Sequence, residues 1–98
     1  MRSRVHLPTI LALALAATPA LAEPNGPMLA QACAGCHGQS GGGAGAIVDI
    51  RGYDRDDFLR TWEEFRTDRR PATIMNRIAR GYTEVEAAAL ADYFSSLE

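Results

Sequence analysis

Apolar residues recur at helical spacing in three stretches of the chain, and polar residues fill the positions between them. The first stretch follows Asn25, the second follows Asp54 and the third follows Thr83. Each of these residues has a side-chain oxygen that can cap the first turn of a helix. We predict three helices with one apolar face each. The faces are Met28, Leu29, Ala32 and Cys33; Phe58, Leu59, Trp62 and Phe65; and Val85, Ala89, Leu90, Tyr93, Phe94 and Leu97.

Turn signals set the limits of these elements. The second helix ends before Pro71, because a proline restricts the preceding residue to extended geometry. Asn76–Arg80 have room for one or two helical turns, and Gly81 suits the position just after a helix. The segment Thr83–Glu86 has the T-x-x-E form of a capping box. No stretch has a convincing strand pattern, so the predicted fold class is all-α, with the N-terminal and C-terminal helices packed together.

The first 22 residues have the features of a secretory signal peptide. Arg2 and Arg4 form a positive start, residues 10–17 are apolar, and Ala20-Leu21-Ala22 matches a cleavage site. The apolar run is too short for a membrane-spanning helix. Cleavage after Ala22 leaves 76 of the 98 residues, a single domain of residues 23–98. We therefore expect export to the periplasm and a core that is small for independent folding.

Charge narrows the range of partners. Residues 23–98 carry eight arginines and twelve acidic residues, a formal charge of −4, and the chain has no lysine. This balance argues against nucleic acid and anionic lipid as partners. Arg69, Arg70 and Arg77 nevertheless cluster along the sequence around Met75. They could pair with acidic groups of a cofactor, pair with an acidic partner, or form a solvated cationic face.

The motif Cys33-Ala34-Gly35-Cys36-His37 has the C-x-x-C-H spacing of a c-type haem attachment site. Two thiols three positions apart on a helix can each form a thioether with a vinyl group of the same porphyrin. The histidine that follows can then ligate the iron. A disulfide would close only a small loop, a thioredoxin-like pair needs a βαβ context, and zinc needs a fourth ligand. We therefore predict one covalently bound haem c, with His37 as an axial ligand.

The second axial ligand must come from another residue, because His6 lies in the signal peptide and His37 is the only histidine after it. A thioether suits haem iron, and residues 23–98 contain two methionines. Met28 lies on the helix that delivers His37, so it cannot reach the opposite face of the ring and is expected in the core. Met75 lies 38 residues after His37, in a predicted connection, and is the expected ligand. The alternative is an open iron with Met75 in the core.

The segments ACAGCHG, TWEEFRTDRRPATIMNRIARGYTEVE and ALADYF resemble class I cytochromes c, and more closely the cytochrome subunits of flavocytochrome c sulfide dehydrogenases. The resemblance implies a small class I cytochrome c fold around one haem. It also implies thioethers at Cys33 and Cys36, and His37 and Met75 as iron ligands. The implied partner is an FAD-containing flavoprotein that oxidises sulfide and passes electrons to the haem. A soluble cytochrome or an oxidase would then accept them.

Two other functions remain open at this stage. The chain could be a free soluble cytochrome c that carries electrons for another dehydrogenase or an oxidase. A gas- or redox-sensing haem domain would need an open coordination position. In each case the protein would supply electron transfer or binding and no acid–base catalysis of its own.

The chain departs from the resembled proteins in the loop between Gly38 and Gly52. Those proteins usually have prolines here, whereas this chain has five glycines among residues 38–45, followed by Ala46-Ile47-Val48. We expect the glycine-rich stretch to be a loop beside the porphyrin edge. A loop carbonyl normally accepts a hydrogen bond from the proximal imidazole, so the sequence leaves the orientation of His37 open.

Overall fold

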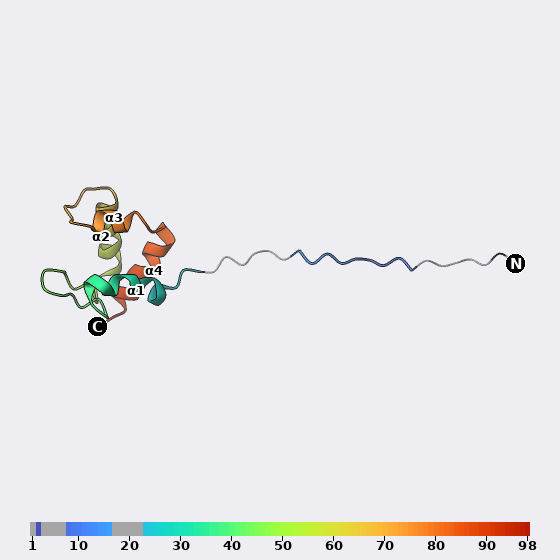
Figure 1. Cartoon of the computed structure of the whole chain (residues 1–98), viewed down its shortest axis with the longest axis horizontal. Coiled ribbons are helices and arrows are strands. Elements are labelled where there is room, and N and C mark those ends of the chain that lie inside the picture. The colour runs from blue at the N-terminus through green and yellow to red at the C-terminus, as the bar shows by residue number, and fades with distance from the viewer. Residues whose placement is uncertain (1, 3–7, 17–22) are drawn as a thin grey trace.

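The computed structural model of the chain describes residues 2, 8–16 and 23–98. Residues 23–98 form a helical domain (Figure 1). Residues 8–16 are exposed and have no regular secondary structure. The predicted cleavage site at Ala20–Ala22 lies outside the described residues. Within the described parts, no helix is both long and apolar enough to cross a membrane.

The domain contains four helices: α1 (Gly26–His37), α2 (Arg55–Arg66), α3 (Met75–Ala79) and α4 (Glu84–Ser95). Among the described residues, β-structure is limited to one isolated bridge between Ala44 and Ile47. The predicted all-α architecture is therefore confirmed. Met75, which was expected in a connection, is instead the first residue of α3.

The three long helices begin where their capping residues predicted. The Asn25 side chain accepts a hydrogen bond from the backbone N–H of residue 28 at 3.1 Å, and Asp54 accepts one from residue 57 at 3.0 Å. At α4, the Thr83 hydroxyl accepts from the Glu86 N–H at 3.1 Å, and the Glu86 carboxylate accepts from the Thr83 N–H at 2.9 Å. This reciprocal pair is the predicted capping box.

Helix α2 ends in a Schellman motif before Pro71. The N–H of Arg69 donates to the carbonyl of Glu64 at 2.8 Å, and the N–H of Asp68 donates to that of Phe65 at 3.2 Å. Asp68 has a φ of 56°. Glycine usually occupies this position, because a Cβ disfavours the left-handed conformation. The predicted stop is confirmed, although the residue that makes it is an aspartate.

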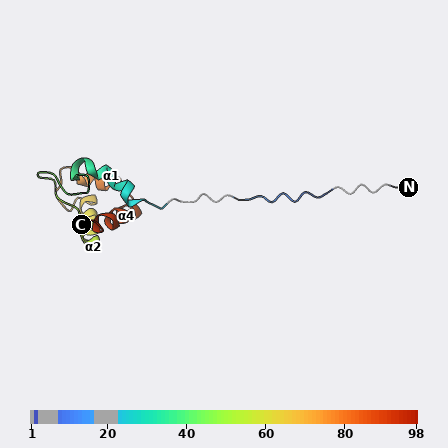
Figure 2. The same ribbon diagram turned by 90° about the horizontal axis from the view of Figure 1, so that it is seen from below.

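The core forms where α4 meets α1 on one side and α2 on the other (Figures 1 and 2). Leu90 and Ala91 of α4 are fully buried, and Phe58 and Trp62 of α2 are nearly so. Helices α1 and α4 cross closely at Gly26, where an added Cβ would lie 2.6 Å from the Ala89 carbonyl oxygen. The predicted contact between the first and last helices is thus present and depends on a glycine.

Three residues of the predicted apolar faces are exposed, namely Met28, Ala32 and Val85. Met28 is 67% exposed and Val85 is 62% exposed. In α1 the side chains that pack against the core are those of Leu29, Ala30 and Cys33. Successive residues of a helix point about 100° apart, so Met28 lies off the face that carries Leu29. Val85 lies in the first turn of α4, before the helix reaches its packing partners. The helical spacing of apolar residues identified the buried face of each helix but predicted that face to be wider than it is.

Candidate functional site

The two cysteines lie on the last turns of α1, and neither forms a disulfide. Cys33 is half-buried and packs against the core, whereas Cys36 is exposed. Burial raises the pKa of the Cys33 thiol, with a smaller contribution from Cys36. A thiol with a raised pKa is not activated as a nucleophile of the thioredoxin type. In the described residues, no three His, Cys, Asp or Glu side chains form a metal-binding group.

The orientation of His37 follows from the loop that succeeds it. Its ring nitrogen Nδ1 lies 2.8 Å from the carbonyl oxygen of Val48. A carbonyl only accepts hydrogen bonds, so Nδ1 carries the proton and Nε2 keeps a free lone pair. The loop lacks the expected prolines but still supplies the carbonyl. The orientation that the sequence left open is therefore the one that suits a metal-ligating imidazole.

Glycines shape the loop that brings Val48 to His37. The N–H of Gly43 donates to the His37 carbonyl at 2.6 Å, and the N–H of Ile50 donates to the Gly41 carbonyl at 2.7 Å. Gly43 has a φ of 81°, and a Cβ there would lie 2.7 Å from the Ile47 carbonyl oxygen. Only glycine fits this turn without displacement. The loop is thus an ordered, hydrogen-bonded support for His37.

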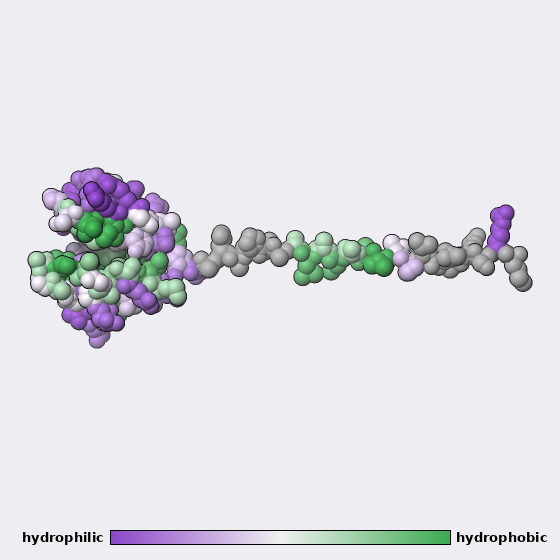
Figure 3. Space-filling view, in the orientation of Figure 1, coloured by the Kyte–Doolittle hydropathy of each residue, from purple (hydrophilic) through white to green (hydrophobic). Residues whose placement is uncertain are grey.

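Helix α3, which begins at Met75, lies across a hollow from α1 (Figure 3). No Cα atom of α1 comes within 8 Å of one in α2 or α3. The space-filling view shows the surface hollowed between the part that contains α2 and α3 and the part that contains α1 and the glycine-rich loop (Figure 3). Met75 is partly buried and packs against the core. The predicted ligands His37 and Met75 therefore belong to two elements that do not pack on each other.

Apolar side chains on both elements remain exposed. Val48 of the loop is 63% exposed and Ile47 is 40% exposed, while Ile74, next to Met75, is 53% exposed. Exposed aliphatic residues in so small a domain suit a site that receives an apolar group. Two free thiols, one oriented imidazole and one thioether make up the donor set. These residues fit a covalently attached haem.

Two aromatic rings of α2 stack on each other, and a third ring packs edge-on against one of them. Phe58 stacks on Trp62 with ring centroids 5.7 Å apart, and Tyr82 meets Trp62 edge-on at 5.5 Å. Burial raises the pKa of the Tyr82 hydroxyl, and the nearby Cys33 adds to this shift. Tyr82 therefore packs against the core through Trp62, a contact that the sequence pattern did not single out.

The arginines predicted to cluster around Met75 differ in their partners. Arg70 donates to Glu64 at 2.8 Å and lies over the Phe65 ring at 5.8 Å. Within residues 23–98, Arg69 and Arg77 are the arginines that make no ion pair with a carboxylate. The unneutralised positive charge of this acidic domain thus lies near Met75 in the sequence, on Arg69 and Arg77.

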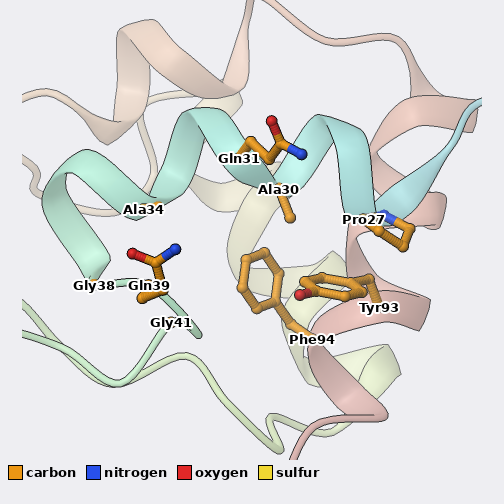
Figure 4. A pocket seen from close by; sticks show the side chains of 9 residues that line it. All are labelled: Pro27, Ala30, Gln31, Ala34, Gly38, Gln39, Gly41, Tyr93 and Phe94. Atoms are coloured by element: carbon orange, nitrogen blue, oxygen red, sulfur yellow. The ribbon is translucent and has the colours of Figure 1, made fainter.

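A separate groove of about 290 Å³ lies between α1, α4 and the start of the glycine-rich loop. Figure 4 shows Ala30 and Ala34 on one side, Tyr93 and Phe94 on the other and Gln39 at the loop end. None of the four predicted haem-binding residues lines this groove. It is therefore distinct from the hollow between α1 and α3.

Comparisons with known proteins agree with this geometry. No family model matches the chain. The cytochrome subunit of sulfide dehydrogenase from Chlorobaculum tepidum is 36% identical over 85 residues, which cover 84% of this chain and 77% of that protein. Cytochrome c-552 from Acidithiobacillus ferridurans is 35% identical over 66 residues, 67% of this chain. The chain spans only 29% of the length of that second relative.

The likeness to the first relative extends over most of both chains and includes residues from more than one helix. The likeness agrees with the four-helix architecture and with the motif that contains Cys33, Cys36 and His37, whose two cysteines form no disulfide. Haem is the cofactor that a cytochrome carries. The chain belongs to the c-type cytochromes, in the family of the cytochrome subunit of sulfide dehydrogenase.

Proposed function

We propose that Cys33 and Cys36 hold one haem c by thioethers and that His37 and Met75 ligate its iron from opposite sides. The observation that carries this proposal is the 2.8 Å hydrogen bond from His37 Nδ1 to the Val48 carbonyl. It leaves Nε2 as the free nitrogen and fixes the plane of the ring. The separation of α1 from α3 supports ligands on two sides of one group. When bound, haem supplies a reversible one-electron couple.

The proposed role is that of the electron-transfer subunit in a sulfide-oxidising enzyme. The relative that covers most of the chain is named as a cytochrome subunit of sulfide dehydrogenase. The proposed partner is an FAD-containing flavoprotein that oxidises sulfide, and the proposed location is the periplasm. A soluble cytochrome or an oxidase would accept the electrons downstream.

Charge supports a face for such a partner. Arg69 and Arg77 are exposed and lack carboxylate partners within residues 23–98, and Ile74 between them is 53% exposed. An acidic rim around an apolar centre on the partner would complement this face. The arginines would guide the approach, and the apolar residue would be covered on contact.

Co-purification tests this role. The chain, tagged at its C-terminus, is purified from cells that are oxidising sulfide, with untagged cells as the control. The expected result is an FAD-containing protein that elutes with the haem protein and reduces it when sulfide is added. A haem protein that elutes without any flavoprotein, yet exchanges electrons with a separate oxidase, would make the chain a free carrier instead.

A further inference from the structure

Asp68 is the one non-glycine residue with a positive φ among the described residues. It occupies the position after α2 where a Schellman motif favours glycine. Glycine would end the helix with less backbone strain, so the aspartate has to be explained by its side chain. Strained residues of this kind mark places where a side chain serves a function.

The carboxylate of Asp68 joins both ends of α3 to the end of α2. Its Oδ1 accepts a hydrogen bond from Asn76 Nδ2 at 3.2 Å, and its Oδ2 accepts one from Arg80 Nη2. Arg80 also donates through Nε to the carbonyl of Arg66 at 3.2 Å. Asn76 directly follows Met75, and Arg80 follows the last residue of α3. These contacts therefore hold two residues that follow Met75, one inside α3 and one just after it.

Helix α3 needs such support. It has five residues, and a helix of that length is not stable by itself in water. Its N-cap residue Ile74 makes no side-chain capping bond and is 53% exposed. The position of Met75 thus depends on packing against α2 and on the hydrogen bonds that Asp68 receives.

We propose that Asp68 is a positioning residue for the sixth iron ligand. Its left-handed backbone aims the carboxylate at Asn76 and Arg80, and this contact keeps the Met75 thioether in place. The inference rests on the proposed function, in which Met75 ligates haem iron. Asp68 itself does not touch the cofactor in this proposal; it acts through α3.

The Asp68→Gly variant separates the backbone role from the side-chain role. Glycine retains the Schellman motif, so far-ultraviolet dichroism and the unfolding temperature of the haem-loaded protein should change little. The loss of the carboxylate should release α3. We expect imidazole to displace Met75 from ferric iron with about fivefold higher affinity, and the Met–haem charge-transfer band to lose intensity. The ferrous form should bind carbon monoxide faster.

Two further variants make the test specific. Asp68→Asn keeps an acceptor for Asn76 but places an amide beside Arg80. Its affinity for imidazole should therefore lie between that of the parent protein and that of the Asp68→Gly variant. Asp57→Asn is the matched control, because the Asp57 side chain pairs with Arg60 within α2 and makes no hydrogen bond or ion pair with α3. It should leave imidazole affinity and the charge-transfer band unchanged.

The outcomes distinguish the two proposals. A band that is present in the parent protein, lost in Met75→Ala and unchanged in Asp68→Gly would overturn the role of Asp68 and leave the ligand assignment intact. A parent protein that lacks the band and binds carbon monoxide readily would overturn both. Equal effects of Asp57→Asn and Asp68→Gly would also contradict a specific role for Asp68.

Discussion

The two sides of the hollow are held by different kinds of interaction. On the His37 side, main-chain atoms make the supporting hydrogen bonds. The N–H of Gly43 donates to the His37 carbonyl, and the Val48 carbonyl accepts from the imidazole. On the Met75 side, side chains supply the hydrogen bonds: besides the packing of α3 on α2, the Asp68 carboxylate receives hydrogen bonds from two residues of the α3 region. Main-chain contacts persist through side-chain substitution, whereas exposed ion pairs are weakened by salt and by single mutations. The Met75 side should therefore be the more easily perturbed.

The strongest test of this difference removes Met75 itself. We expect Met75→Ala to keep its covalent haem and its helix content, because the His37 side does not depend on α3. The Met–haem charge-transfer band should disappear, and the reduction potential should fall by on the order of 0.1 V, within the ~0.8 V range that axial ligands control. Absorption spectroscopy and redox titration measure both. A band that persists in this variant would show that another residue ligates the iron.

A glycine substitution tests the His37 side. Gly43→Ala should destabilise the haem-loaded protein by about 1–3 kcal/mol, because the new Cβ would meet the Ile47 carbonyl at 2.7 Å and φ is 81°. Gly45→Ala is the matched control, since Gly45 has a φ of 58° with no atom within 4 Å of its Cβ position. Thermal unfolding should show a smaller loss for Gly45→Ala. Equal losses would mean that the main-chain contact does not matter.

Charge reversal near Met75 should have a moderate effect on association. Arg77→Glu should lower the rate of electron exchange with the proposed flavoprotein several-fold at low salt, and the difference should shrink as salt is added. Arg60→Glu makes the same charge change on an arginine already paired with Asp57. Stopped-flow mixing over a range of ionic strength compares them. Identical rates for the two variants would remove the docking role of Arg77.

Lowering the pH should have the smallest effect on stability until the carboxylates become protonated. Hydrogen bonds from the Arg51 side chain, then from its backbone, lower the pKa of Asp49; one from Arg66 lowers the pKa of Glu63. Each folded pKa lies below its unfolded value, so these groups stabilise the fold above about pH 4 and stop doing so as pH falls through the folded pKa. The unfolding temperature should be flat from pH 7 to 5 and decline below pH 4. A decline that begins near pH 6 would point to another group.

Much of the fold could be predicted from local chemistry. Asn25, Asp54 and Thr83 mark the helix starts because their side chains complete hydrogen bonds within three residues. Contacts of that range are encoded locally. Met28 and Val85 were assigned wrongly because exposure depends on which neighbours reach the edge of a helix face. That is decided by tertiary packing.

The candidate site divides in the same way. The Cys33 and His37 positions follow from a motif of five residues, whereas the Val48 acceptor is a main-chain carbonyl that leaves no trace in residue type. The contact of Tyr82 with Trp62 and the contacts of the Asp68 carboxylate with Asn76 and Arg80 depend on chain segments that meet only after folding. Sequence patterns named the proposed ligands but not the groups that support them.

The lack of packing between α1 and α3 has a consequence for the order in which this protein is built. Helix α1 joins the rest of the domain through α4, and α3 joins it through α2. Helices α1 and α3 therefore do not contact each other directly, and in the proposed function the haem would bridge them. We expect attachment at Cys33 and Cys36 to come first, on an open chain, and closure of α3 over the ring to come last. In the proposed function, the placement of Met75 would then be the last step of assembly.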